Sequence, residues 1–269
     1  MLTRRALLIT AAALPLAACA TGIGASARPE IKVATFNIWH DREDWPARLP
    51  LLVEALRESG ADVIALQEVL QDEAKGLPNQ AETIAAALGG YSVHFFSTDP
   101  QGKPRRYGNA ILTRLPVLET ASVKLEPLND YRTALRVRVE AGGRPVDMVV
   151  THLAWKPDQG PMRAQQIAHL MSWLPSDDVP LVVMGDFNAP LDDSGLAALT
   201  SGRFESALPE GAVSTTLNTA EGHKPRVIDH IFAERRWFTV EGARRIGDQP
   251  VNGVYPSDHF GVVAALRLR

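Results

Sequence analysis

The chain has 269 residues, 45% of them hydrophobic and 22% charged, and its formal net charge is −3. This composition is ordinary for a globular protein, so it excludes a disordered or fibrous chain and leaves room for one large domain or two small ones. The slight negative charge gives no general attraction to nucleic acid, and the single cysteine excludes an internal disulfide and a zinc site built from several cysteines.

The first segment of the chain is typical of an export signal. Two arginines at positions 4 and 5 precede an uncharged, mostly apolar run over 6–18, which is too short to span a bilayer comfortably. The run ends in the letters LAAC, which resemble a bacterial lipobox, and the resemblance implies cleavage before Cys19 and lipidation of that residue. We therefore expect a protein exported to the periplasm or outer envelope and held at the membrane by a lipid anchor alone. The arginine pair leaves both the general and the twin-arginine export routes open.

Beyond residue 30 the sequence carries short apolar runs typical of strands and fewer amphipathic runs typical of helices. The expected strands are Ile31–Phe36, Val63–Leu66, Ala110–Leu112, Leu135–Val139, Val146–Val150, Leu181–Met184, Val227–Phe232 and Gly261–Leu268. The expected helices are Trp45–Ser59, Gln80–Leu88 and Arg163–Leu174. Strands outnumber helices and several follow one another across short turns, which favours two mixed sheets packed face to face with helices outside.

Most of these strands are bordered by polar residues that a buried strand does not need. Those residues are Asn37, Gln67 with Glu68, His152, Asp186 with Asn188, Asp229, and, before the last strand, Asp258 with His259. Each of them alone has an ordinary interpretation as a turn, a cap or a solvated side chain. Because ligands of α/β sheets gather outside the strand ends, the six ends together predict one convergent polar site.

The polar residues sit in short motifs that follow a known family order. The motifs are ATFN (34–37), LQEV (66–69), YGNAIL (107–112), THL (151–153), GDFN (185–188), IDHI (228–231) and SDH (257–259). The ordered set resembles the endonuclease/exonuclease/phosphatase superfamily. The resemblance implies a four-layer α/β sandwich, with two packed mixed β-sheets flanked by helices, over residues 31–269. A signal peptide over 1–18 and a small, polar tether over 19–30 would precede it.

The resemblance also implies a divalent-metal-dependent phosphoesterase, most simply a phosphodiesterase. Such chemistry needs a nucleophilic water and neutralisation of charge at phosphorus. Mg²⁺ is the expected cofactor, with Mn²⁺ or Ca²⁺ as alternatives, because carboxylate and amide oxygens suit these ions. By family position, Glu68, Asn37 and Asp258 would hold the metal.

Catalytic roles follow from the same resemblance. Asp186 would activate the attacking water, and His259 would stabilise the charge at phosphorus or act as general acid. Asp229 would accept a hydrogen bond from His259 and fix its tautomer. His152 would contact the phosphate or assist the leaving group.

Three further residues, Asn188, Tyr107 and Asn109, are expected to bind the phosphate. The nuclease branch of the superfamily places an acidic partner near the strand over 107–112, where this chain has only Tyr107 and Asn109. Neither residue can replace a carboxylate, so the duty of His152 stays open. The histidines that lie outside the motifs, His40, His94, His169 and His223, are expected to be ordinary surface or core residues.

The sequence does not rank the possible substrates, which are nucleic acid, a phospholipid headgroup or an organic phosphate. The basic residues over 103–106, with Arg114 and Arg132, either meet such an anion or belong to a solvated loop, and the loop interpretation is slightly favoured. A monomer is expected. The alternatives are a catalytically inactive binding module and a structural envelope lipoprotein on the same fold. The complete set of motif residues speaks against the inactive module.

Overall fold

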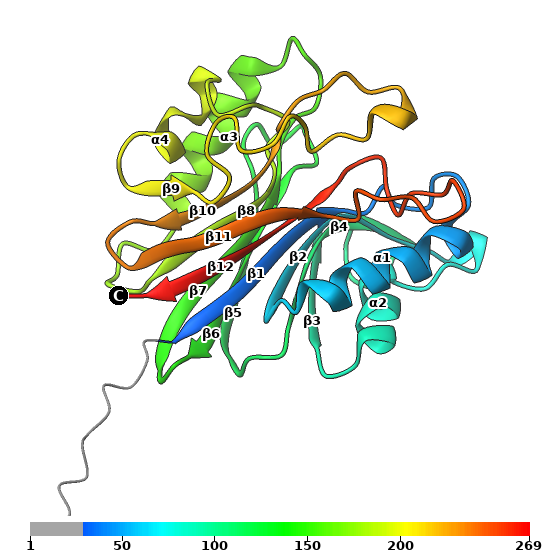
Figure 1. Ribbon diagram of the computed structural model, residues 1–269, viewed down its shortest axis with the longest axis horizontal. Coiled ribbons are helices and arrows are strands. Elements are labelled where there is room, and N and C mark those ends of the chain that lie inside the picture. Colours follow the sequence, from blue (N-terminus) through cyan, green and yellow to red (C-terminus); the bar gives the residue numbers. More distant parts are fainter. Residues whose placement is uncertain (1–28) are drawn as a thin grey trace, which may run out of the picture.

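The computed structural model describes residues 29–269, which form two six-stranded sheets with helices outside (Figure 1). The strands are β1 (Glu30–Asn37), β2 (Val63–Asp72), β3 (Ser92–Ser97), β4 (Arg105–Thr113), β5 (Val117–Lys124), β6 (Thr133–Ala141), β7 (Arg144–His152), β8 (Leu181–Asp186), β9 (Phe204–Ser206), β10 (Asp229–Glu234), β11 (Phe238–Ile246) and β12 (Gly261–Leu268). The helices are α1 (Trp45–Ser59), α2 (Gln80–Leu88), α3 (Gly160–Trp173) and α4 (Ala197–Thr200), with short 3₁₀ turns η1 (Glu73–Lys75), η2 (Ser194–Leu196) and η3 (Thr219–Glu221).

Both sheets are mixed. Sheet A has the order β11-β12-β1-β2-β4-β3, and sheet B has the order β5-β6-β7-β8-β10-β9. In each sheet the central pair is parallel, β1 with β2 and β7 with β8, and every other pairing is antiparallel. The carboxyl ends of the two central pairs therefore meet the amino ends of their antiparallel neighbours β10 and β12.

The layers are held by three apolar clusters. One lies between the sheets and includes Val33 of β1 and Val150 of β7. A second joins sheet A to α1 and α2 through side chains such as Leu52, and a third joins sheet B to α3 and α4 through side chains such as Leu170. Helix, sheet, sheet and helix are thus stacked as four layers, which confirms the predicted sandwich.

Local sequence signals fix the element boundaries. Helix α1 begins after Asp44, whose carboxylate accepts a hydrogen bond from the Ala47 amide, and it ends at Gly60 in the left-handed conformation. The predicted bounds of α1, α2 and β12 are those of the structure. The other predicted strands form as well and extend beyond their predicted bounds, β2 and β4 most of all, except that β10 begins and ends two residues later than predicted. Helix α3 begins at Gly160 and ends at Trp173, where the prediction had Arg163 and Leu174.

Four strands were not predicted: β3, β5, β9 and β11. They lie at the edges of the two sheets. Strand β5 has no fully buried residue and β11 is mostly exposed or half-buried, so neither carries a continuous apolar run.

The predicted signal peptide, the lipidation site Cys19 and most of the predicted tether lie outside the described residues. Within residues 29–269, the helices are too short and too polar to cross a membrane.

Candidate active site

The predicted site residues gather where the two sheets meet, at the carboxyl ends of the central strands. Asn37 ends β1, His152 ends β7 and Asp186 ends β8. Asp229 begins β10 and pairs directly with Asp186, while His259 lies two residues before β12. Five segments far apart in the sequence thus deliver polar side chains to one place.

The carboxylate of Asp186 is the meeting point of the cluster. Its Oδ2 atom accepts a hydrogen bond of 3.0 Å from the Asn37 amide and lies 3.3 Å from His152 Nε2 and 3.8 Å from His259 Nε2. Its Oδ1 atom accepts a hydrogen bond from the Asn188 backbone amide. Asp186 is 1% exposed, so these groups replace most of the water that would otherwise solvate the carboxylate.

Asp229 and His259 form a buried pair beside Asp186. His259 Nδ1 lies 3.0 Å from Asp229 Oδ2 and 3.2 Å from Asp229 Oδ1, which leaves His259 Nε2 facing Asp186. Asp229 is itself fully buried, and its amide binds the hydroxyl of Thr216. The pairing predicted between Asp229 and His259 is therefore present in the structure.

A β-bulge presents Glu68 to the site. The register of β2 with β4 shifts between Leu66 and Val69, and Glu68 has a positive φ of 61°, which is costly for a residue with a side chain. Glu68 Oε1 accepts a hydrogen bond of 3.2 Å from the same Asn37 amide that binds Asp186. Asn37 is held in this orientation because its oxygen accepts the Trp39 backbone amide.

The GDFN turn after β8 depends on two unusual backbone positions. Gly185 lies so close to β7 that a Cβ atom there would be 2.0 Å from the Thr151 carbonyl oxygen. Asn188 has a φ of 52°, a conformation that asparagine tolerates, and its amide group binds the Leu153 carbonyl. The turn is thereby fixed to the THL motif of β7.

The SDH motif is fixed to β1 in a similar way. The Ser257 hydroxyl binds the Asn37 carbonyl at 2.7 Å and accepts the His259 amide. Asp258 Oδ2 lies 3.0 Å from Nε2 of His223. The ring centres of His223 and His259 are 6.4 Å apart. His223 was expected to be an ordinary residue, whereas the structure places it against a predicted metal ligand.

The two predicted phosphate-binding residues of β4, Tyr107 and Asn109, have different surroundings. Tyr107 packs edge-on against His40 and Tyr131. Burial raises the pKa of the Tyr107 hydroxyl, and the negative charge of Glu68 raises it further. Asn109 is 3% exposed, and its amide binds the carbonyl and hydroxyl of Thr133 in the other sheet. The hydrogen bonds of Asn109 thus join the two sheets.

Burial sets the protonation of the cluster. Burial raises the pKa of Asp186 to about 7, and Asp229 adds to this rise while the charge of His259 opposes it. Burial by itself would lower the pKa of His259, but the carboxylates of Asp229 and Asp186 raise it well above its ordinary value. Burial, together with the charges of Arg132 and His259, holds the pKa of His152 well below its ordinary value. Two imidazoles a short distance apart thus favour opposite protonation states at neutral pH.

The donor chemistry fits a divalent cation. Glu68 is a half-buried carboxylate with Oε2 at 4.0 Å from His40 Nε2, and hard cations prefer such oxygens. Asp186, Asp229 and His259 offer one ligand atom each within 4.8 Å of one another. Glu68 and the set of Asp186, Asp229 and His259 therefore each suit a metal ion. The members of that set already make hydrogen bonds within the cluster.

Besides His223, His40 was expected from the sequence to be an ordinary residue. His40 lies beside Glu68 and binds Asp41 through its Nδ1 atom. Arg132, for which a solvated loop was slightly favoured over contact with an anion, is 3% exposed and directly precedes β6. The position of Arg132 next to a strand start is the one signal that could have separated it from the exposed basic residues.

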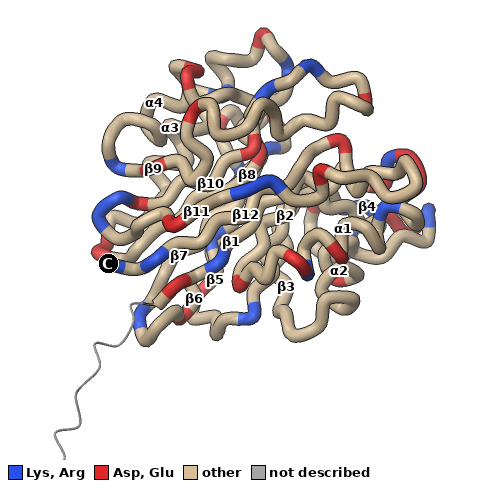
Figure 2. Tube along the Cα trace, in the orientation of Figure 1, with Lys and Arg blue, Asp and Glu red and all other residues tan. Residues whose placement is uncertain are grey.

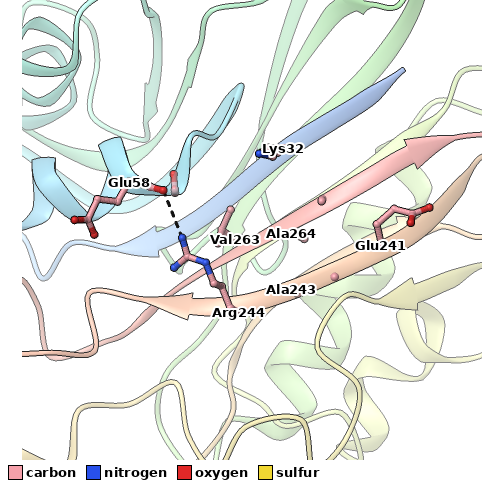
Figure 3. A pocket seen from close by; sticks show the side chains of 10 residues that line it. Lys32, Glu58, Glu241, Ala243, Arg244, Val263 and Ala264 are labelled. Carbon is pink, nitrogen blue, oxygen red and sulfur yellow. Dashed lines mark hydrogen bonds between the residues drawn. The ribbon is translucent and has the colours of Figure 1, made fainter. Parts of the chain in front are cut away.

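A cavity of about 370 Å³ opens beside the cluster. It is lined by His40, Thr98, Asp99, Arg105, Tyr107 and Tyr131, and its size falls in the range of small-molecule sites. A second cavity of about 390 Å³ lies between the end of α1 and strands β1, β11 and β12, where Arg244 reaches the Glu58 carbonyl (Figure 3). The described lining of that second cavity contains no predicted site residue.

Solved structures share this fold. The human Nocturnin catalytic domain with bound sulfate is 22% identical with a TM-score of 0.73, over 90% of this chain and 96% of that one. D. rerio TDP2 in complex with a single-strand DNA product is 19% identical with a TM-score of 0.72, over 88% and 99%. A protein of the endonuclease/exonuclease/phosphatase family from Beutenbergia cavernae is 24% identical with a TM-score of 0.71, over 90% and 72%.

The match at the level of sequence rests on a family model. No curated protein is similar enough to this chain to be reported as a relative. The model of the family whose members are metal-dependent phosphoesterases and nucleases matches residues 34–259, a span that contains every residue of the cluster. The chain belongs to the endonuclease/exonuclease/phosphatase family.

Proposed function

We propose that this protein is a divalent-metal-dependent phosphodiesterase in which Asp186 activates the attacking water. The observation that carries the proposal is the convergence of Asn37, His152 and His259 on Oδ2 of one buried carboxylate. With a pKa of about 7, Asp186 can accept a proton at neutral pH and is a stronger base than an ordinary aspartate.

The reaction is a hydrolysis in which one P–O bond forms and another breaks. A water molecule gives a proton to Asp186 Oδ2 as its oxygen attacks phosphorus. The bond to the leaving oxygen breaks on the opposite side, and that oxygen takes up a proton from solvent to leave as the alcohol. The imidazolium of His259 faces the same region and stabilises the negative charge that develops on the phosphoryl oxygens. Asp229 keeps that imidazole oriented and charged.

Glu68 is the proposed anchor of the metal, with Asn37 positioning its carboxylate and Asp258 as the second carboxylate. A bound divalent cation would supply Lewis-acid activation of the ester and neutralise the anionic phosphate. Mg²⁺ is the proposed ion because the donor oxygens suit a hard cation, with Mn²⁺ and Ca²⁺ as the ions to compare. Asn188 and Tyr107 are proposed to contact the phosphate.

The proposed substrate is a phosphate ester outside the cytoplasm: nucleic acid, a phospholipid headgroup or an organic phosphate. Lys and Arg are interspersed with Asp and Glu along the chain trace (Figure 2), and the formal net charge of −3 gives no general attraction to duplex DNA. Lipid anchoring at Cys19 and a monomeric state are part of the same proposal.

A substrate panel tests the activity. Purified protein is assayed with Mg²⁺, Mn²⁺ or Ca²⁺, and with EDTA, on plasmid DNA, RNA, sphingomyelin, inositol phosphates and bis-p-nitrophenyl phosphate. Hydrolysis that EDTA abolishes and that Asp186→Asn lowers mainly in kcat supports the proposal. Asp192→Asn, an exposed aspartate of the same loop, is the matched control and should retain activity. Failure of the wild type to hydrolyse any ester with any metal would favour the inactive binding module.

A further inference from the structure

Arg132 differs from the other arginines that the fold buries. Four arginines of residues 29–269 are buried, with exposed fractions between 2% and 7%: Arg48, Arg132, Arg136 and Arg163. The guanidinium of Arg48 is bound by backbone carbonyls, that of Arg136 by the carboxylates of Asp147 and Glu119, and that of Arg163 by further carbonyls. The guanidinium of Arg132 makes no hydrogen bond and no ion pair with any residue in this part of the chain, and its Nε atom is fully buried.

The location of Arg132 connects it to the cluster. Arg132 precedes the first residue of β6, and the pairing of Ala134 with Thr151 places that strand start beside the end of β7 at His152. The ring of Tyr131 lies 4.6 Å from the guanidinium carbon, and the charge of Arg132 acts on both His152 and Tyr107. The guanidinium therefore lies against the face of Tyr131, at the end of the sheet where His152 lies.

A buried, unpaired guanidinium is unfavourable because its charge has lost water and gained no anion. The carboxylates of Asp186 and Glu68, whose charges act on Tyr107 together with that of Arg132, are bound by Asn37 and do not pair with Arg132. No group of residues 29–269 therefore supplies the partner, whereas an anion bound in the site would. A guanidinium has a planar fork of donors that matches two oxygens of one phosphate group.

We propose that Arg132 binds the non-bridging oxygens of the scissile phosphate, from the side of His152 and Tyr107. The inference rests on the proposed function, since it names how that site holds its substrate. Arg132 would contribute mostly to substrate binding, while Asp186 and His259 contribute mostly to the rate of the chemical step. Stacking on Tyr131 keeps the guanidinium plane fixed before the phosphate arrives.

Inorganic phosphate is the probe for this site. Its dissociation constant is measured by calorimetry with Mg²⁺ present and again with EDTA, and its inhibition constant is measured on bis-p-nitrophenyl phosphate. Loss of a charged hydrogen-bond donor should weaken phosphate binding of Arg132→Gln by about 10- to 100-fold and raise KM more than it lowers kcat. The phosphate affinity of Arg132→Lys should lie between those of the wild type and Arg132→Gln, because lysine keeps the charge but lacks the planar fork of donors.

Folding stability separates this role from a structural one. Arg132→Gln removes an unpaired buried charge, so its midpoint in urea should equal or exceed that of the wild type. Arg136→Gln is the matched control, because it removes a paired buried arginine from β6, the strand that Arg132 directly precedes. That variant should unfold at lower urea while binding phosphate as the wild type does.

The possible results distinguish the inference from the proposed function. If Arg132→Gln binds phosphate as tightly as the wild type does, Arg132 is not a phosphate ligand, even where Asp186→Asn confirms hydrolysis. If the wild type hydrolyses no ester but loses phosphate binding with Arg132→Gln, the anion site stands and the enzymatic proposal fails. A loss of stability in Arg132→Gln as large as that in Arg136→Gln would also overturn the inference.

Discussion

Nδ1 of His259 lies 3.0 Å from Oδ2 of Asp229, while Nε2 of the same ring lies 3.8 Å from Oδ2 of Asp186. One imidazole thus joins two carboxylates that pair across β8 and β10. Asp229 fixes which nitrogen of His259 faces Asp186, because its carboxylate accepts a hydrogen bond from Nδ1–H. The three side chains should therefore act as a unit.

This unit predicts strong non-additivity between Asp229 and His259. His259→Ala removes the imidazolium that stabilises the developing negative charge and should lower kcat by about 10²- to 10³-fold. Asp229→Asn should lower kcat because the ring loses the carboxylate that orients it and raises its pKa. In the His259→Ala background the Asp229→Asn change should have little further effect. The measurement is a double-mutant cycle on kcat at saturating metal, and losses that simply multiply would show that the pair is not coupled.

The sequence was sufficient to predict most of the central architecture and the motifs that meet at the site. Buried strands such as β8 are continuous apolar runs ending in polar residues, and these features are visible without a structure. Edge strands were missed because half of their residues face water.

The contacts of individual residues were less predictable. His223 and Arg132 have no motif around them, and only the folded chain shows that they lie beside Asp258 and His152. Asn109 lies within a motif, yet its recorded hydrogen bonds are with Thr133. Long-range pairing decides such contacts, and a linear motif does not encode it.

Glu68→Gln is expected to weaken metal binding. The change keeps the size of the side chain but removes the charge that the β-bulge presents to the site. Replacing one carboxylate ligand should raise the Mg²⁺ concentration for half-maximal activity by about tenfold or more, and excess metal should restore part of the rate. Calorimetric titration with Mn²⁺ provides a readout independent of activity. Glu82→Gln, at an exposed position of α2, is the control, and a Glu68→Gln titration identical to that of the wild type would exclude Glu68 as a ligand.

Gly185→Ala is expected to destabilise the fold and disrupt the active site. The added methyl group would lie 2.0 Å from the Thr151 carbonyl oxygen, at a φ of 153°, so β8 must move away from β7. Overpacking of this kind costs about 1–3 kcal/mol and sometimes more. Urea unfolding measures the loss, and Gly242→Ala on β11 serves as control, because Gly242 has open space around it and no positive φ. An unchanged midpoint for Gly185→Ala would mean that the strands separate freely at this point.

Cys19→Ser tests the proposed lipid anchor. The LAAC sequence at the end of the apolar run motivates this change, and several acyl chains on one residue would hold the protein at a membrane where a single chain binds only marginally. The variant should either keep its signal peptide or appear in the soluble fraction. Processing is followed by mass spectrometry and membrane fractionation. If the variant is cleaved and sedimented as the wild type is, lipidation at Cys19 is excluded.

His152 predicts how folding stability changes with pH in the metal-free protein. Its pKa is held well below its ordinary value by burial and by the charges of Arg132 and His259, whereas in the unfolded chain it is about 6.5. Below pH 6.5, His152 is protonated in the unfolded chain but stays neutral in the folded protein. The free energy of unfolding therefore falls as pH falls, by up to about 1.4 kcal/mol per pH unit for this residue.

Urea unfolding in EDTA measures this effect. Between pH 7.5 and 5.5, the free energy of unfolding should fall more for the wild type than for His152→Gln. His94→Gln is the comparison variant. His94 is half-buried on β3, and its pKa is lowered by burial alone. Parallel pH profiles of the wild type and His152→Gln would show that His152 is protonated as readily in the folded protein as in the unfolded chain.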